Sequence, residues 1–267
     1  MPKQVPSWIS DVTRVAVLSG AGISTGSGIP DYRGPDGVWT RDPAAAAAFT
    51  LDTYLANPDV RARFWRTYVD HAAWQAQPNA AHQALVRLDE SGIAVRVLTQ
   101  NIDGLHQRAG LADRKVLELH GTMWTTTCTR CRSTFPTTAV RARVAAGEHD
   151  PHCTACGGLL KLDTVLFGQN LNPDIMGRAV AIVSNTPLLV AVGSSLLVEP
   201  AAQLCRVAVE RGAHLVVINR DPTPYDQLAV EVIRADITDA VADLVDQLIT
   251  PGARVRGADD ARRRMPA

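Results

Sequence analysis

The 267-residue sequence predicts an α/β fold, in which helices cover both faces of a doubly wound parallel sheet and a small cysteine-rich domain is inserted. Two observations predict this fold. Short apolar runs alternate along the chain with segments whose apolar residues recur at helical spacing. Two Cys-x-x-Cys pairs lie in a segment that interrupts this alternation, and such pairs are typical of a metal-binding insertion.

Five apolar runs predict the strands of the sheet. Each run is four or five residues long and rich in Val and Leu, and the alternation of these runs with helical patterns is the arrangement expected of a parallel sheet covered on both faces. The predicted strands are Val15–Leu18, Val95–Leu98, Val116–Leu119, Leu188–Val192 and Leu215–Ile218.

Four helices are predicted between and after these strands. Residue types that begin or end helices mark several of their boundaries: Asn79 and Thr238 are expected as N-caps, and Gly92 and Gly212 follow predicted C-termini. The predicted helices are Asp59–Trp74, Ala80–Ser91, Pro200–Arg211 and Thr238–Ile249.

Charge and composition exclude several classes of function. The chain carries 27 basic and 27 acidic side chains, so it has no net field that would attract nucleic acid or a membrane surface. Its first six residues lack the apolar core of a signal peptide, and no apolar run approaches the roughly 18 residues of a membrane helix. We therefore expect a soluble cytoplasmic protein that binds neither nucleic acid nor membranes directly.

A glycine-rich turn follows the first predicted strand. The tract Gly20-Ala21-Gly22-Ile23-Ser24 lets backbone N–H groups approach a pyrophosphate closely, and it leads into Gly28-Ile29-Pro30-Asp31-Tyr32-Arg33-Gly34. On its own the pattern is common, and Thr25 stands where the usual dinucleotide fingerprint has its third glycine. A dinucleotide is expected to bind here if further motifs support it.

The cysteines predict a structural zinc site. Cys128, Cys131, Cys153 and Cys156 form two Cys-x-x-Cys pairs with 21 residues between them, close to the spacing of a zinc ribbon. The alternatives are two disulfides or four inert thiols, and a cytosolic location disfavours disulfides. His152 is a conceivable substitute ligand, but four thiolates already fill the coordination shell, so the zinc is expected to be structural.

Two polar groups follow predicted strands and are candidates for catalysis. His120 ends the strand before the cysteine-rich segment, where α/β folds place ligands, and an imidazole can take a proton from a hydroxyl near neutral pH. Gln100-Asn101-Ile102-Asp103 follows another strand, and its amides and carboxylate suit a ligand with a ribose and a carboxamide. A solvated turn is the alternative there. Of the remaining histidines, His82 and His106 are expected to be structural.

Four sequence blocks together carry a resemblance to a known family. They are the glycine-rich tract that begins at Gly20, Gln100-Asn101-Ile102-Asp103, Leu119-His120-Gly121 and the two Cys-x-x-Cys pairs. In this order they resemble the sirtuin family of NAD-dependent protein-lysine deacylases, and the resemblance covers roughly residues 15–248. It implies transfer of the acyl group to ADP-ribose with release of nicotinamide. It also implies a Rossmann-like NAD-binding domain of residues 1–121 and 165–250, a zinc domain of residues 122–164 and a flexible tail of residues 251–267. NAD and an acyl-lysine peptide would bind in the cleft between the two domains.

The resemblance also assigns roles to residues. His120 would activate a ribose hydroxyl, Asn101 would orient the nicotinamide ribose and a water, and Asp103 would hold the nicotinamide carboxamide. The residues implied to contact NAD are Gly20, Ala21, Gly22, Ser24, Asp31, Tyr32, Arg33, Gln100, Asn101, Asp103, Gly193, Ser194, Ser195, Asn219, Arg220, Asp236 and Ile237.

The acylated protein is implied to bind as an extended added strand. The segments implied to flank it contain Val165, Leu166, Phe167, Gly168, Leu197 and Val198. Trp65 and Tyr68 stand where sirtuins that remove succinyl or malonyl groups carry Tyr and Arg, so we expect apolar acyl groups to be preferred, although Trp65 can equally be a core residue.

Several positions depart from the family pattern without removing a catalytic group: Tyr32 for Phe, Thr122 for Asn, Lys161-Leu162 for Arg-Pro and Gln169 for Glu. Leu162 and Gln169 are implied to flank the peptide cleft, so they leave the preference for peptide sequence open. The tract from Gly34 to Thr40 resembles a branch that includes long-chain deacylases and ADP-ribosyltransferases. Two alternatives to a deacylase therefore stay open: a protein mono-ADP-ribosyltransferase and a non-enzymatic sensor of NAD or ADP-ribose.

Overall fold

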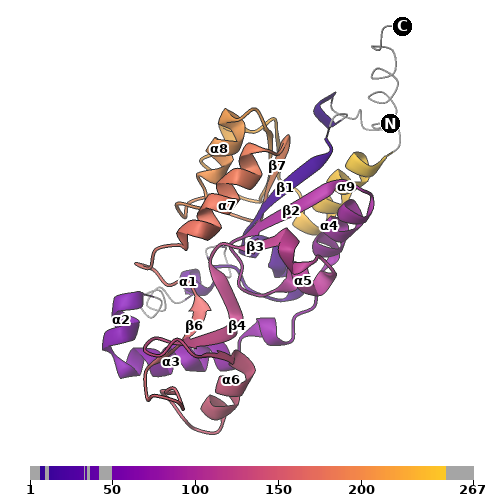
Figure 1. The fold of residues 1–267 in the computed structure, drawn as a ribbon. Helices are drawn as coiled ribbons and strands as arrows, with labels where there is room; N and C mark the ends of the chain where they lie inside the picture. The colour runs from indigo at the N-terminus through magenta and orange to yellow at the C-terminus, as the bar shows by residue number, and fades with distance from the viewer. Residues whose placement is uncertain (1–6, 10–11, 33, 35–36, 42–49, 251–267) are drawn as a thin grey trace, which may run out of the picture.

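A six-stranded parallel sheet forms the centre of the molecule (Figure 1). The computed structural model describes residues 7–9, 12–32, 34, 37–41 and 50–250. The strand order is β3-β2-β1-β7-β8-β9, which is the order of a doubly wound, Rossmann-like sheet, so the predicted fold class is confirmed. The strands are β1 (Arg14–Ser19), β2 (Ala94–Thr99), β3 (Val116–Glu118), β7 (Leu188–Val192), β8 (His214–Ile218) and β9 (Glu231–Ile233).

Helices cover both faces of this sheet, as expected. Val15 and Val17 of β1 point into a core with α4 (Ala80–Glu90) and α9 (Ile237–Ile249), whereas Ala16 and Leu18 point into a second core with α7 (Pro173–Ser184) and α8 (Leu204–Glu210). Figure 1 shows the two pairs on opposite sides of the strands. Both faces are buried, which explains why the strands read as continuous apolar runs.

The five predicted strands are confirmed within two residues at each end, but β9 was not predicted. It is only three residues long and lies at the sheet edge, where Glu231 and Ile233 are half-buried and Val232 is exposed. A strand this short has too few residues for a periodic pattern to emerge from the sequence.

The predicted cap and end of α4 are confirmed. The Asn79 side chain accepts hydrogen bonds from the N–H groups of Ala81 and His82, and Gly92 follows the helix with φ = +90°. The predicted cap of α9 was wrong. Its N-cap is Asp236, whose carboxylate accepts a hydrogen bond of 2.8 Å from the backbone N–H of Thr238.

Two other helix predictions had wrong boundaries. The helix predicted over Asp59–Trp74 is α3 (Pro58–Val69), capped by Asn57, followed by a separate 3-10 turn η4 (Ala72–Trp74). The His71 side chain caps that second turn, and the apolar spacing runs through the break. The helix predicted from Pro200 begins only at Leu204, because residues 199–203 form turns.

A second, three-stranded antiparallel sheet has the order β5-β4-β6. Its strands are β4 (Gly121–Cys128), β5 (Thr134–Pro136) and β6 (Leu160–Thr164). Helices α2 (Leu51–Ala56), α3 and α6 (Thr137–Ala145) gather around it at the lower end of Figure 1, and together they enclose one hydrophobic core. This smaller core therefore combines two segments that are distant in the sequence.

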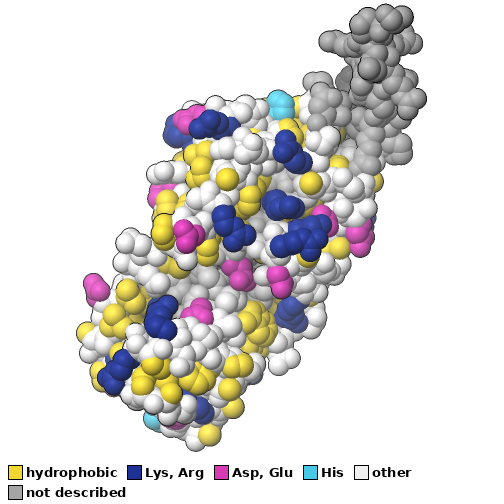
Figure 2. Space-filling view, in the orientation of Figure 1, with side chains coloured by type: hydrophobic (Ala, Val, Ile, Leu, Met, Phe, Trp, Pro, Cys, Tyr) yellow, Lys and Arg dark blue, Asp and Glu magenta, His cyan; other side chains and the backbone are white. Residues whose placement is uncertain are grey.

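The remaining elements are short and lie mainly in connections: η1 (Ser7–Ile9), η2 (Ala21–Ser27), α1 (Val38–Arg41), α5 (Leu105–Ala109), η5 (Asp113–Lys115) and η6 (Asp226–Leu228). No helix in the described part of the chain combines the length and hydrophobicity needed to cross a bilayer. On the face shown in Figure 2, basic and acidic side chains are interspersed over the part that holds the sheet.

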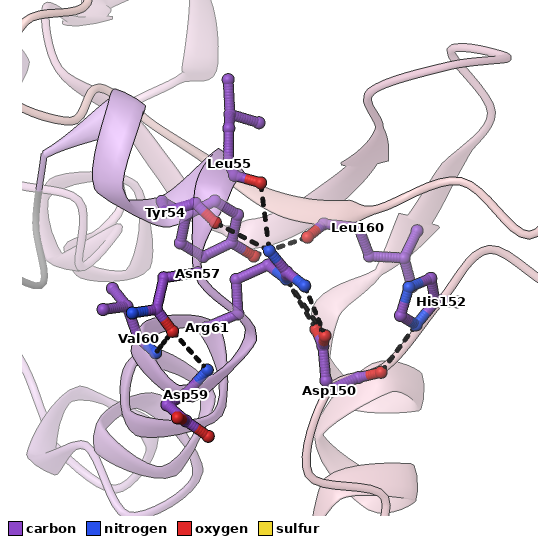
Figure 3. Close-up of polar contacts among 9 residues, drawn as sticks. All are labelled: Tyr54, Leu55, Asn57, Asp59, Val60, Arg61, Asp150, His152 and Leu160. Atoms are coloured by element: carbon purple, nitrogen blue, oxygen red, sulfur yellow. Dashed lines mark hydrogen bonds and ion pairs between the residues drawn. The ribbon is translucent and has the colours of Figure 1, made fainter.

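Arg61 links α3 to the cysteine-rich segment (Figure 3). Its Nε and Nη2 donate to the two carboxylate oxygens of Asp150 at 2.9 and 2.8 Å, and its Nη1 donates to the carbonyls of Tyr54 and Leu55. Beside it, the Tyr54 hydroxyl donates to the carbonyl of Leu160 at 2.6 Å. Because Arg61 is only 7% exposed, this bidentate pair is mostly shielded from water.

Arg61→Met is expected to lower the free energy of unfolding by about 3 kcal/mol, because it leaves Asp150 and two carbonyls without their donor in a mostly buried place. Urea unfolding of zinc-loaded protein measures this. The matched control is Arg87→Met, which removes an exposed ion pair with Asp246 and is expected to cost less than about 1 kcal/mol. Equal losses in the two variants would contradict the analysis.

Candidate active site

A large cavity opens at the carboxyl ends of β1, β2, β7 and β8, where the direction of strand order reverses. Its volume is about 1370 Å³. Ligands of doubly wound sheets bind at this switch point. The predicted site residues that line it are Gly20, Ala21, Gly22, Asp31, Tyr32, Tyr68, Gln100, Asn101, His120, Val165, Leu166, Phe167, Gly168, Gly193, Ser194, Ser195, Val198, Asn219, Arg220 and Ile237.

Other predicted site residues lie elsewhere. Ser24 and Asp103 are buried just behind the residues that line the cavity, and Asp236 caps α9. Leu197 is 61% exposed and precedes Val198, which lines the cavity. Arg33 lies outside the described residues. Trp65 was expected to contact the substrate but does not line the cavity: it is 1% exposed in the smaller core, edge-on to Phe64, as the alternative of a core residue predicted.

The loops after β1 and β7 meet backbone to backbone. The N–H of Gly22 donates to the carbonyl of Gly193 at 2.8 Å, and the N–H of Gly20 donates to the carbonyl of Val192 at 2.9 Å. A Cβ on Gly22 would lie 2.7 Å from the Cα of Gly193, whose φ is +60°. Only glycine fits at these positions, and the result is a bare backbone surface at the cavity that suits a phosphate.

The amide of Asn101 is held by buried partners. Its Nδ2 donates to the carbonyl of Gly20 at 3.1 Å and lies 3.2 Å from the Ser24 hydroxyl, which donates to Asp103 Oδ2 at 2.7 Å. Asp103 Oδ1 accepts a further bond from the N–H of Leu105. Burial raises the pKa of Asp103, and these hydrogen bonds oppose that shift.

The His120 ring is oriented by a backbone carbonyl. Its Nδ1 lies 3.1 Å from the carbonyl of Gln100, and because a carbonyl can only accept, Nδ1 carries the proton and Nε2 is the basic nitrogen. Burial lowers the pKa of His120, so the ring is neutral at pH 7. The Gln100 side chain in turn donates to the Ser194 hydroxyl at 2.9 Å, which links the loops after β2 and β7.

Two further histidines are structural, as expected. His82 completes the cap of α4 with Asn79, whose Nδ2 donates to the carbonyl of Ile23 at 2.8 Å. His106 Nε2 pairs with the Ser19 hydroxyl at 2.9 Å. Burial lowers the pKa of His82 to about 4 and that of His106 well below its usual value, so both rings stay neutral behind the cavity.

The four cysteines form a compact sulfur cluster. The Sγ atoms of Cys128 and Cys156 are 3.5 Å apart, those of Cys131 and Cys153 are 3.6 Å apart, and all four lie within 4.8 Å of one another. A disulfide needs about 2.05 Å, whereas a tetrahedral zinc with bonds of about 2.3 Å separates its sulfurs by about 3.8 Å. The donor set therefore fits zinc, with a full shell and a structural role.

Among the described residues, the sulfur cluster does not include His152. The Nδ1 of His152 lies instead 2.8 Å from the carbonyl of Asp150. The cavity also includes residues that the sequence analysis did not select, among them Arg41, Thr164, Met176 and Asp221. They come from the ends of α1 and β6, the first turn of α7 and the loop after β8, which only the tertiary fold brings together, and no local pattern marked them.

Comparison with known proteins shows similarity to one family. Residues 20–200 match the model described as the Sir2 family. The chain is 56% identical over 231 residues to NAD-dependent protein deacetylase 2 of Streptomyces coelicolor, which covers 86% of this chain and 96% of that protein. It is 35% identical over 245 residues to the NAD-dependent protein deacetylase of Thermotoga maritima, covering 92% and 97% of the two chains.

Solved structures are similar as well. A Sir2 protein with a deacetylated p53 peptide and 3′-O-acetyl ADP ribose superimposes with a TM-score of 0.81 at 35% identity, covering 92% of this chain and 96% of that one. A Sir2 complex with a p53 peptide and NAD gives a TM-score of 0.79 at 35% identity, covering 90% and 95%.

Cys128→Ala is expected to remove the zinc and unfold the small β5-β4-β6 sheet, because a structural zinc site contributes folding energy directly. Metal analysis and near-ultraviolet circular dichroism measure both effects. The control is Cys205→Ala, which changes a buried cysteine on α8 outside the cluster and should keep about one zinc per chain. Full zinc content in Cys128→Ala would contradict the assignment.

Proposed function

The chain belongs to the Sir2 family and is an NAD-dependent protein deacetylase, and we propose that the cavity at the switch point binds NAD and the acyl-lysine side chain together. One observation carries this proposal. The cavity brings the neutral, basic Nε2 of His120 together with the glycine backbone of the β1 and β7 loops and with the segment that follows β6.

The donor groups of the cavity fit the parts of NAD. The bare backbone of Gly20–Gly22 with the hydroxyls of Ser194 and Ser195 suits phosphates, and Asn219 and Arg220 suit the adenine ribose at the end of β8. We assign the adenine ring to the backbone near Asp236 and Ile237. When bound, NAD supplies the ADP-ribosyl group that accepts the acyl group as nicotinamide leaves.

We assign the nicotinamide end to the loop after β2. Asn101, fixed by the carbonyl of Gly20 and the Ser24 hydroxyl, would orient the ribose and a water. Asp103 would hold the carboxamide, and Asp31 and Tyr32 would shield it from solvent. Burial matters here because water that reached the reacting ribose carbon early would hydrolyse NAD.

His120 is the general base of this proposal. Its Nε2 accepts the proton of a ribose hydroxyl, and the Gln100 carbonyl stabilises the imidazolium that forms through the Nδ1 hydrogen bond. A neutral ring is the form that can act as a base, and burial keeps the ring in that form at pH 7.

The acylated protein would add a strand beside Val165–Gly168. One side of this segment is already occupied, since the N–H of Leu51 donates to the carbonyl of Phe167 and the N–H of Val165 donates to the carbonyl of His120. Phe167 is 41% exposed beside the cavity and could contact the incoming peptide. Recognition through the main chain tolerates many peptide sequences.

The cysteines and the balance of charge bear on where the protein acts and on what it binds. Four thiolates that hold zinc favour a reducing compartment, and we propose the cytoplasm. Equal numbers of basic and acidic side chains give no general attraction to nucleic acid, so we propose that protein segments with an acylated lysine are the partners.

His120→Ala is expected to slow deacetylation by about 10²–10⁴ and to leave the dissociation constant of NAD within a few fold, because the base acts after NAD is bound. Because burial lowers the pKa of His120, the loss of wild-type kcat/KM at acid pH should have its midpoint below the ordinary histidine pKa of about 6.5. The control is His149→Ala, which changes an exposed histidine. Near-normal turnover of His120→Ala, or loss of NAD binding, would contradict this role.

The enzyme is expected to prefer acetyl or longer apolar acyl groups over succinyl. On α3, Tyr68 lines the cavity, Arg61 is paired with Asp150, and Arg63 and Arg66 are exposed, so α3 offers no cation to a succinyl carboxylate. An unpaired carboxylate costs several kcal/mol to desolvate. Acyl-peptide assays at matched NAD measure the preference. A higher kcat/KM for succinyl-lysine than for acetyl-lysine would contradict the expected preference. If the activity on succinyl-lysine were then lost in Arg41→Met, Arg41, which also lines the cavity, would be the cation that pairs with the succinyl carboxylate.

A further inference from the structure

The indole of Trp124 lies against the loop that carries Asn101 and Asp103. Its Nε1 donates to the backbone carbonyl of Asp103 at 2.9 Å. The preceding residue of β4 contributes a second bond, from the N–H of Met123 to the carbonyl of Ile102 at 3.1 Å. Two successive residues of β4 therefore hold two successive carbonyls of this loop.

The backbone at the end of the loop leaves room for this indole. Gly104 has φ = +70°, and a Cβ built on it would lie 2.7 Å from Trp124 Nε1. The absence of a side chain at Gly104 is thus what allows the indole N–H to reach the carbonyl of Asp103.

The indole also contacts two further side chains. Trp74 packs edge-on against it, with ring centroids 5.0 Å apart and planes at 83°, and the Arg108 guanidinium lies 5.8 Å from its ring centroid. Trp124 is half-buried and does not line the cavity, so it can act on a ligand only through the loop.

We propose that Trp124 is a positioning residue for the nicotinamide end of the site. The inference rests on the proposed function, which places the nicotinamide carboxamide at Asp103. The Asp103 carboxylate is aimed by the Ser24 hydroxyl and the N–H of Leu105, and its backbone is fixed by the Trp124 indole. Since β4 continues to Cys128, the Trp124 indole, together with the Met123 backbone N–H, connects the zinc-binding segment to the nicotinamide loop.

Trp74 provides a matched control from the same aromatic pair. Its Nε1 also donates to a backbone carbonyl beside the cavity, that of Tyr68 at 2.6 Å, but this carbonyl belongs to α3 and not to the nicotinamide loop. Trp→Phe at either position removes one indole N–H and keeps an aromatic ring. A general loosening of the aromatic pair would affect both variants, whereas a positioning role is specific to Trp124.

The experiment compares Trp124→Phe and Trp74→Phe with the wild type. Calorimetry gives the dissociation constant of NAD, inhibition kinetics give the inhibition constant of nicotinamide, and steady-state assays give the KM of an acetyl-lysine peptide. Trp124→Phe is expected to weaken binding of NAD and of nicotinamide by about five-fold each, the range of one lost hydrogen bond. The peptide KM and the zinc content should stay within about two-fold, and Trp74→Phe should leave NAD and nicotinamide binding unchanged.

The proposal is overturned if Trp124→Phe leaves both constants unchanged, if it raises the peptide KM as much as the NAD constant, or if Trp74→Phe weakens NAD equally. A wild-type protein that binds NAD without deacetylating acetyl-lysine peptides would instead contradict the proposed function. In that case the NAD affinity of Trp124→Phe, measured without turnover, still tests the role of Trp124.

Discussion

The close backbone contact between Gly22 and Gly193 is the constraint on which the site depends. Parallel pairing places β1 beside β7, and the loops that leave these strands can adjoin only because neither residue has a side chain. The carbonyl of Gly20, held in place by this contact, then accepts the amide of Asn101. The part of the cavity wall formed by these two loops is therefore main chain, and its position follows from the register of the sheet.

Behind this wall lies a layer of buried polar side chains without net charge at neutral pH apart from Asp103. His82 and His106 stay neutral because they are shielded from water, and they hold the carbonyl of Ile23, through Asn79, and the hydroxyl of Ser19. Neutral hydrogen-bonded groups can be buried at far lower cost than ions. The layer thus supports the loops from behind and leaves ionisable chemistry to the residues that face the ligand.

The sequence predicted a feature correctly wherever a local pattern of residue types has one physical explanation. Apolar runs predicted the central strands, the cysteine spacing predicted the sulfur cluster, and Asn79 predicted a helix start. The sequence was less informative where contacts with distant parts of the chain determine whether a side chain is buried or lines the cavity. Trp65 and Tyr68 are both aromatic, lie three residues apart on α3 and are both buried in the smaller core, yet only Tyr68 also lines the cavity. Nothing local distinguishes Arg61, buried against Asp150, from its exposed neighbours Arg63 and Arg66.

The mixed origin of the smaller core has a consequence for how the chain folds. The hydrogen bond between Tyr54 and Leu160 joins residues 106 positions apart, so α2 and α3 cannot complete their packing until the whole cysteine-rich segment is available. Closing so long a loop is slow compared with forming a local helix pair. During synthesis from the N-terminus, α2 and α3 therefore lack these packing partners until β6 has emerged from the ribosome, and transiently exposed apolar surface of this kind favours aggregation.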